Sequence, residues 1–347
     1  FDTGCIFYRG LDMQKQFFTR FSIVLILMVT FFLFGCASSD SDGGGSSSTA
    51  GEDWTQATAS MGQSDFSYEK LLVHDGKLWA IGRNETAGSY ANDVWNSSDG
   101  ITWTKVADTA DFAPRHQFGF LSFDDKMWVI AGEEADGEGA YNDVWSSTDG
   151  ATWTEATSDA GFYKRREPGS VVFNDKMWII GGESDGTSDV WSSSDGVNWS
   201  QATSNTGFSY RLVHMSLVFD DKMWVIGGHG GSGTDESLYN DVWYSSDGAT
   251  WTQATDEAAF EERGYHAVLA YNNKMWVIGG LIEPTTDDYE AVNDVYSSTD
   301  GITWTQVTGS AAFSARGAQG AAVFNNQMWI LGGSDLTNNL YDVWYSP

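Results

Sequence analysis

The sequence predicts an all-β fold, a ring-shaped propeller of six blades with four antiparallel strands each, and three observations lead to this prediction. The stretch KMWVIGG at 222–228 recurs six times with little change, at intervals of 46 to 53 residues between its tryptophans. A repeat near fifty residues is typical of a propeller blade. An Asp-Val-Trp or Asp-Val-Tyr motif also occurs six times, and a further tryptophan motif follows it in five of the six units. The tryptophans of the first motif are Trp79, Trp128, Trp178, Trp224, Trp276 and Trp329.

Each repeat has the pattern of two β-hairpins. In the unit 211–255, the first hairpin turns at Asp220-Asp221 and ends at Gly227-Gly228. The second begins with DVWYS at Asp241 and turns at Ser246-Asp247-Gly248. Short alternating strands separated by such turns form hairpins, and units of this size become stable by stacking around a common axis.

The two ends of the chain predict how the ring closes. The last unit lacks its final strand, whereas WTQAT at 54–58 matches 251–255 residue for residue. We therefore expect the N-terminal strand to complete the sixth blade and to remove its open edge. A closed ring of this kind is expected to be a monomer.

The first fifty residues predict export and anchoring. Residues 1–12 precede Met13 and are interpreted as a non-native upstream segment, and residues 13–35 have the charged and apolar layout of a signal peptide. The apolar run 21–34 is shorter than the roughly 20 residues of a spanning helix. Residues 36–51 are rich in Gly and Ser and are expected to form a tether, with the propeller at 52–347.

Leu33-Phe34-Gly35-Cys36 resembles the bacterial lipobox. The resemblance implies that Cys36 is lipidated, becomes the mature N-terminus and holds the protein on the membrane of the cell envelope. Ala37 after it implies the outer membrane or cell surface. The alternative is an ordinary signal peptide in which the cysteine is accidental.

Charge and cysteine content exclude several classes of partner. The chain has 18 basic and 48 acidic residues, a net charge of −30, and a pI near 4.1. Nucleic acid is therefore not an expected partner, because binding it requires clustered positive charge. Cys5 and Cys36 are the two cysteines of the chain, so the propeller region has no disulfide, and no metal or cofactor is predicted. Binding of calcium stays open.

The repeats resemble the kelch family over nearly the whole region 52–347. The double glycine of the second strand, the Asp-Val-Trp of the third and the tryptophan of the fourth stand where that family has them, with departures at Arg83 and Ala131. The turn SSDGITW from Ser97 and its four relatives is similar to a shortened Asp-box, the turn of sialidase-type propellers. We expect its aspartate to have a structural role.

Propeller geometry predicts which end of the ring carries the function. The turns within hairpins are minimal and share one end, whereas the loops between second and third strands vary and share the other. Variable loops on a repeated scaffold are where recognition usually lies.

Five arginines and four other residues are candidates for an axial site on that end. The arginines each lie thirteen residues before the tryptophan of their unit, at Arg115, Arg165, Arg211, Arg263 and Arg316, with Phe66 in the first unit. They either hold an anion in a ring of guanidinium groups or form scaffold ion pairs with the Asp-Val-Trp aspartates. Three residues further on, the sequence varies, giving Glu69, Phe118, Pro168, His214, His266 and Gln319. We select Glu69, His214, His266 and Gln319 from this set. The two histidines could bind a metal or move protons, or they could be core residues.

Three classes of function fit these features. The first is a lipid-anchored binding module for a glycan or a protein, which uses the variable face. The second is a carbohydrate-active enzyme, since kelch propellers include a sialic acid mutarotase and Asp-box propellers include sialidases. A sialidase would need an arginine cluster, a Tyr-Glu nucleophile pair and an acid-base aspartate. The third is a structural envelope protein without a small ligand.

Overall fold

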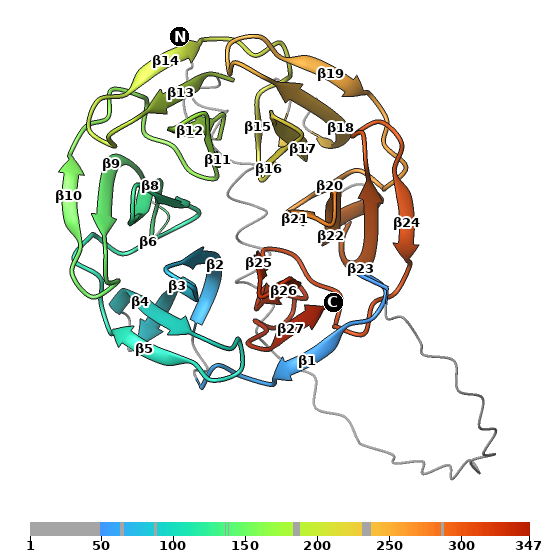
Figure 1. Ribbon diagram of the computed structural model, residues 1–347, viewed down its shortest axis with the longest axis horizontal. Coiled ribbons are helices and arrows are strands. Elements are labelled where there is room, and N and C mark those ends of the chain that lie inside the picture. The colour runs from blue at the N-terminus through green and yellow to red at the C-terminus, as the bar shows by residue number, and fades with distance from the viewer. Residues whose placement is uncertain are drawn as a thin grey trace, which may run out of the picture. The chain divides into compact units, whose positions relative to one another are not determined.

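The computed structural model describes residues 49–62, 66–86, 89–135, 137, 139–182, 188–230, 237–285 and 288–347. The chain divides into two units, 1–49 and 50–347. The second unit is a closed ring of six antiparallel sheets that surround a central axis (Figure 1). The predicted six-bladed, all-β fold is therefore confirmed. Among the described residues there is no helix long and apolar enough to cross a bilayer, and the predicted leader, Cys36 and the tether up to residue 48 lie outside them.

Each blade runs outward from the axis in the order of its strands (Figure 1). Blade 1 contains β2 (Phe66–His74), β3 (Lys77–Thr86), β4 (Ser89–Ser97) and β5 (Thr104–Ala107). Blade 2 contains β6 (Arg115–His116), β7 (Gly119–Phe123), β8 (Lys126–Glu134), β9 (Ala140–Ser147) and β10 (Thr154–Thr157). Blade 3 contains β11 (Gly169–Phe173), β12 (Lys176–Ile180), β13 (Val190–Ser193) and β14 (Ser200–Thr203).

Blades 4 to 6 repeat this arrangement. Blade 4 contains β15 (Arg211–Leu212), β16 (Met215–Phe219), β17 (Lys222–Gly230), β18 (Ser237–Ser245) and β19 (Thr252–Thr255). Blade 5 contains β20 (Arg263–Gly264), β21 (Ala267–Tyr271), β22 (Lys274–Thr285), β23 (Asp288–Ser298) and β24 (Thr305–Thr308). Blade 6 contains β25 (Gly320–Phe324), β26 (Gln327–Leu331), β27 (Val343–Ser346) and β1 (Thr55–Thr58). In blades 2, 4 and 5 the innermost strand is interrupted, so it is counted as two pieces.

The hydrophobic core lies between blades rather than within them. Each repeated tryptophan of a second strand packs beneath the turn glycine of the next blade, where no side chain would fit. A Cβ on Gly196 would lie 2.0 Å from the Trp128 ring, and one on Gly150 would lie 2.3 Å from Trp79. Edge-to-face pairs such as Phe112 and Trp153, with ring centroids 5.2 Å apart, extend the same interface.

The Ser-Asp-Gly turns are held by their own side chains, as predicted. In the turn of blade 3, Asp195 Oδ1 accepts hydrogen bonds of 2.8 Å from the N–H groups of Val197 and Asn198. These bonds favour the ionised carboxylate and lower the pKa of Asp195 to about 2. The aspartate is therefore a structural element of the turn.

The N-terminal strand closes the ring, and this prediction is confirmed. β1 pairs antiparallel with β27, Thr55 opposite Tyr345. The Gly51 N–H donates to Ser346 Oγ at 2.8 Å, which reproduces the bond from Gly100 to Ser97 Oγ within blade 1. Gly51 thus serves as the turn glycine of blade 6, and the compact unit that contains the propeller spans Ala50–Pro347.

We expect Gly51→Ala to destabilise the propeller by about 2 to 4 kcal/mol, because overpacking a filled site forces side chains or backbone to move. The new Cβ would lie 2.3 Å from the Trp276 ring. The matched control is Gly161→Ala, which has nearly the same positive φ, 81° against 79°, and nothing within 4 Å. Denaturant unfolding of both variants checks the prediction. Equal losses in the two would show that backbone strain, and not ring closure, accounts for the effect.

Candidate functional site

Five residues with a left-handed backbone surround the axis at the start of the inner strands. They stand two positions after the five arginines and have φ between 50° and 60°: Gln117, Glu167, Val213, Tyr265 and Ala318. Left-handed φ is uncommon for residues other than glycine and is unfavourable for a β-branched one such as Val213. We call these five residues the collar.

Backbone hydrogen bonds join collar residues of neighbouring blades. The N–H of Glu167 donates to the carbonyl of Gln117 at 2.8 Å, and that of Tyr265 to the carbonyl of Val213 at 3.2 Å. The N–H of Ala318 donates to the carbonyl of Tyr265 at 2.8 Å. These bonds join blade 2 to blade 3, blade 4 to blade 5 and blade 5 to blade 6.

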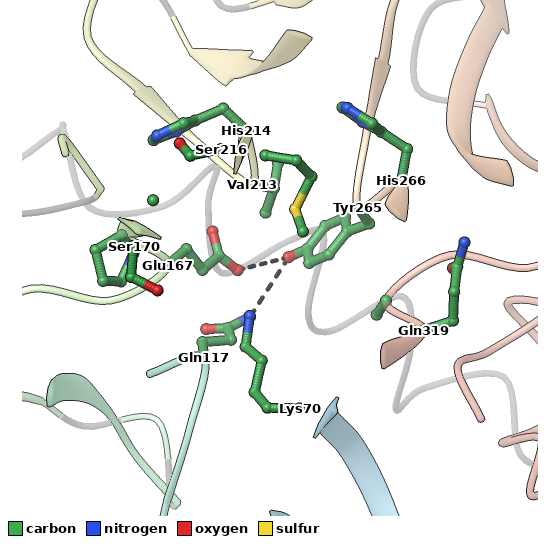
Figure 2. A pocket seen from close by; sticks show the side chains of 14 residues that line it. Lys70, Gln117, Glu167, Ser170, Val213, His214, Ser216, Tyr265, His266 and Gln319 are labelled. Atoms are coloured by element: carbon green, nitrogen blue, oxygen red, sulfur yellow. Dashed lines mark hydrogen bonds between the residues drawn. The ribbon is translucent and has the colours of Figure 1, made fainter. Parts of the chain in front are cut away.

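A cavity of about 110 Å³ lies inside the collar (Figure 2). All five collar residues line it, and the largest share of its wall comes from residues 167–170 of blade 3 and 213–216 of blade 4. Lys70, His266 and Gln319 complete the polar part of the lining. Residues of all six blades therefore line the cavity.

A chain of hydrogen bonds crosses the cavity. The hydroxyl of Tyr265 donates to Glu167 Oε1 at 2.8 Å, and Gln117 Nε2 donates to that hydroxyl at 3.5 Å. Figure 2 shows these three side chains and Lys70 converging from different blades. Burial lowers the pKa of Lys70, while the charge of Glu167 opposes the shift. The carboxylate of Glu167 therefore offsets part of the effect of burial on Lys70.

The two candidate histidines lie in the cavity wall and are uncharged at neutral pH. Burial, and then the nearby positive charge of Arg211, lower the pKa of His214 to about 3. Burial and Arg263 do the same for His266, also to about 3. At pH 7 neither group therefore exchanges a proton readily. The described residues contain no cluster of three or more His, Cys, Asp or Glu side chains able to share a metal ion.

The positions chosen for their variability divide into three groups. Pro168, His214, His266 and Gln319 line the cavity. Phe118 is buried in the core between blades 1 and 2. The side chain of Glu69 lies outside the described part of the chain. The structure thus brings together three of the four residues selected there.

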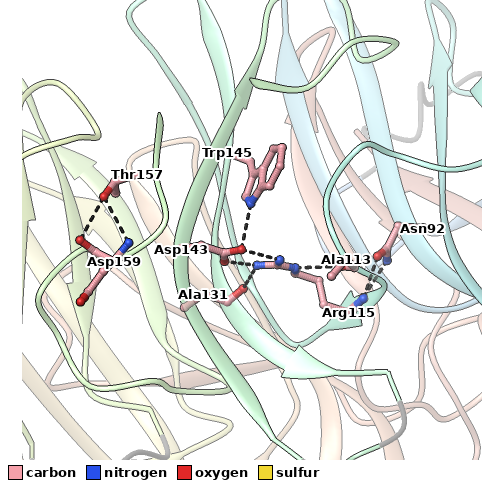
Figure 3. Close-up of polar contacts among 8 residues, drawn as sticks. All are labelled: Asn92, Ala113, Arg115, Ala131, Asp143, Trp145, Thr157 and Asp159. Atoms are coloured by element: carbon pink, nitrogen blue, oxygen red, sulfur yellow. Dashed lines mark hydrogen bonds and ion pairs between the residues drawn. The ribbon is translucent and has the colours of Figure 1, made fainter. Parts of the chain in front are cut away.

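The arginines occupy a different environment. Arg115 is fully buried, and Figure 3 shows its guanidinium facing Ala131 of the second strand and Asp143 of the third strand of blade 2. Nη1 donates to the Ala131 carbonyl at 3.0 Å and to Asp143 Oδ1, and Nη2 donates to Asp143 Oδ2 at 2.8 Å. Nε donates to the Ala113 carbonyl at 3.1 Å. Four of the five N–H donors of a guanidinium are thereby engaged.

The same clamp recurs in four more blades, which corrects the prediction that these arginines frame an anion site. The guanidinium is at most 1% exposed in every case, and none of the five lines the described cavity. Each is bonded to an aspartate and to two backbone carbonyls, so the scaffold alternative describes its role. The pairs are Arg115–Asp143, Arg165–Asp189, Arg211–Asp241, Arg263–Asp294 and Arg316–Asp342.

Blade 1 lacks the arginine and satisfies its aspartate in another way. Asp93 is fully buried and receives the Lys105 ammonium at 2.8 Å and Asn84 Nδ2 at 3.0 Å. Burial opposes the charge of Lys105, but its bonds to Asp93 and Asp108 raise its pKa overall. The other repeats carry Gln or Glu where Lys105 stands. Lys105, on the fourth strand of blade 1, therefore replaces the missing arginine as the cationic partner of Asp93.

Sequence reasoning missed the collar and Lys70. The collar position is variable, with Tyr68, Gln117, Glu167, Val213, Tyr265 and Ala318 in the six units. The collar position lies one residue before the variable position from which we selected His214, His266 and Gln319. Its own variability could therefore have identified it. What the sequence could not indicate is the left-handed backbone, which directs this residue to the axis.

Fold and site together define a kelch-type propeller with an axial cavity, and comparison with known families agrees. The model of the KLHDC2/KLHL20/DRC7 Kelch-repeats domain matches residues 147–333, more than half of the chain. The chain therefore belongs to the kelch-repeat family. A second family model, the DUF6242 beta propeller domain, matches residues 81–193. Comparison with curated proteins gives no significant match.

We expect Arg211→Ala to destabilise the propeller by about 3 kcal/mol, because it leaves Asp241 without its partner in a largely buried position. The control is Lys222→Ala, which removes a cation from an exposed pair with Asp220 and should change stability by less than about 1 kcal/mol. Denaturant unfolding measures both. An Arg211→Ala variant of unchanged stability that fails to bind a ligand would restore the arginines to the site.

Proposed function

We propose that the protein is a lipid-anchored binding module outside the cytoplasm, which takes a glycan or a protein on the loop-bearing end of the ring. The axial cavity is the centre of this binding surface. Membership of the kelch family is compatible with such a role. The anchor holds the module on a membrane, and the acidic surface, net −30, keeps it soluble above that membrane.

The collar is the observation that carries the proposal. Five non-glycine residues hold left-handed φ at one repeated position, where glycine would adopt the same backbone without steric cost. Strain of about 1 to 3 kcal/mol per residue is maintained where the side chain serves a function. Here the retained side chains differ from blade to blade and line one cavity, as expected of a site for an asymmetric ligand.

The anchor is supported by the sequence at the end of the leader. Lys15 and Arg20 precede the apolar run, and Leu33-Phe34-Gly35-Cys36 stands where cleavage is expected. The Gly/Ser-rich stretch that follows is suited to hold the ring away from the membrane. We infer the envelope, with the outer membrane or cell surface as the location.

Replacing Cys36 by Ser should move the protein from the membrane fraction to the soluble fraction, because no lipid can then be attached. The measurement is cell fractionation, with mass spectrometry of the mature N-terminus of the unaltered protein. Ser38→Ala is the control and should stay with the membrane. An unmodified N-terminus in the native protein would refute the anchor and leave the binding role untouched.

The binding role predicts that Tyr265→Phe weakens ligand binding about three- to tenfold, since one hydrogen bond in the cavity is lost. The soluble ring from Ala50 on is screened on a glycan array and against envelope proteins. Tyr163→Phe, at a position 61% exposed, is the matched control and should bind normally. If the screen yields no ligand at all, the binding proposal fails.

A carbohydrate-active enzyme of the sialic acid mutarotase or sialidase-like kind is the second candidate. The bond of 2.8 Å between Tyr265 and Glu167 favours it, because a phenol next to a carboxylate can act as nucleophile and base. The clamped arginines weigh against a sialidase, which needs such groups on its substrate. Turnover of sialosides and of free sugars by the intact ring, abolished in Glu167→Gln, would favour this candidate over the binding module.

A further inference from the structure

We propose that the axial cavity recognises an uncharged, hydroxyl-rich group the size of one sugar unit, and that it discriminates against the corresponding acid. This inference rests on the proposed binding function and specifies the ligand of the same site.

The charge of the cavity is the first step. Among the described lining residues, Lys70 and Glu167 are the basic and the acidic side chain, and burial, opposed by Glu167, lowers the pKa of Lys70, which disfavours its charged form. The histidines are neutral for the reasons given above. The nearest guanidinium groups are already bonded to aspartates. A carboxylate entering the cavity would therefore lose its hydration without gaining an uncompensated cation, which is unfavourable.

The hydrogen-bonding capacity of the wall is the second step. Gln319 donates from Nε2 to the Ile278 carbonyl at 2.8 Å, which fixes the amide and leaves its Oε1 without a partner in the described part of the chain. Within the same part, Gln117 Oε1 and Ser216 Oγ also have no hydrogen-bond partner. Buried polar atoms without partners are unfavourable unless a ligand or water satisfies them.

The imidazoles of His214 and His266 add both hydrogen-bond donors and hydrogen-bond acceptors to the wall. Neither ring nitrogen of His266 has a hydrogen-bond partner among the described residues. The Ile180 and Arg211 carbonyls face His214 only loosely, outside hydrogen-bond geometry. A neutral imidazole offers one donor and one acceptor. A hydroxyl group both donates and accepts, so it can satisfy amide oxygens and either imidazole nitrogen.

Size is the third step. At roughly 10 to 15 Å³ for each water-sized group, the cavity of about 110 Å³ holds some seven to eleven such groups. This is close to a single monosaccharide and too little for two. Gly169 contributes to the shape, since a Cβ there would lie 2.3 Å from Ser216 Oγ.

The test is calorimetric titration of the ring from Ala50 on with matched pairs of ligands: glucose against glucuronate, and galactose against galacturonate, with N-acetylneuraminate as a further acid. We expect at least one neutral member to bind tenfold or more tightly than its acid. Gln117→Leu should weaken that binding about three- to tenfold. Gln253→Leu makes the same change at an exposed position of β19 and should have no effect.

Methyl glycosides of the neutral sugars distinguish the two sources of such a group. Binding at least as tight as that of the free sugar indicates the end of a glycan, and loss of binding indicates a free monosaccharide. Tighter binding of the acids, abolished in Lys70→Met, would overturn the inference. So would the absence of binding by every member of the panel. In either case, a ligand found in the wider screen would leave the binding function standing.

Discussion

The buried Arg–Asp pair is the interaction on which both the blade and the site depend. In blade 2, Arg115 bonds to the second strand through Ala131 and to the third through Asp143, so one side chain fixes three strands. Burying an ion pair is favourable only if nearly all its hydrogen-bonding groups are satisfied, and here they are. The same saturation removes the guanidinium groups from the axis. What is left facing the axis is polar, with one basic and one acidic side chain, Lys70 and Glu167, among the described lining residues.

The exceptions to the repeat show which constraints are strict. Ala131 replaces the first glycine of the pair yet keeps φ at 59°, against 54° to 62° in the equivalent glycines of blades 3 to 6, and its carbonyl still accepts the bond from Arg115. Blade 1 exchanges the arginine for Lys105 and Asn84 around Asp93. In both cases the aspartate of the third strand keeps a bonded cation while a residue of the repeat changes. The scaffold therefore constrains the hydrogen-bonding pattern more strongly than the sequence.

This explains how far the sequence could predict the structure. The number of blades, their strands, the closing strand and the structural role of the turn aspartates follow from local patterns that recur. The site follows less well, since the choice between an anion site and a clamp depends on whether Arg211 faces the axis or Asp241, and both fit the same spacing. His214, His266 and Gln319 were found because they vary within a fixed repeat. Tyr265 and Glu167 were missed because their left-handed backbone has no sequence signature.

The left-handed collar also explains why the site can be specific without disturbing the ring. Each collar residue uses its backbone to bond the neighbouring blade, as the Ala318 N–H does to the Tyr265 carbonyl, and this bond is independent of the side chain. The scaffold thus tolerates residues as different as Val213 and Glu167 at equivalent places. The wall of the cavity has its largest contribution from residues 167–170 of blade 3 and 213–216 of blade 4. These unequal shares make one side of a nearly symmetric ring different from the others, and an asymmetric ligand requires such a difference.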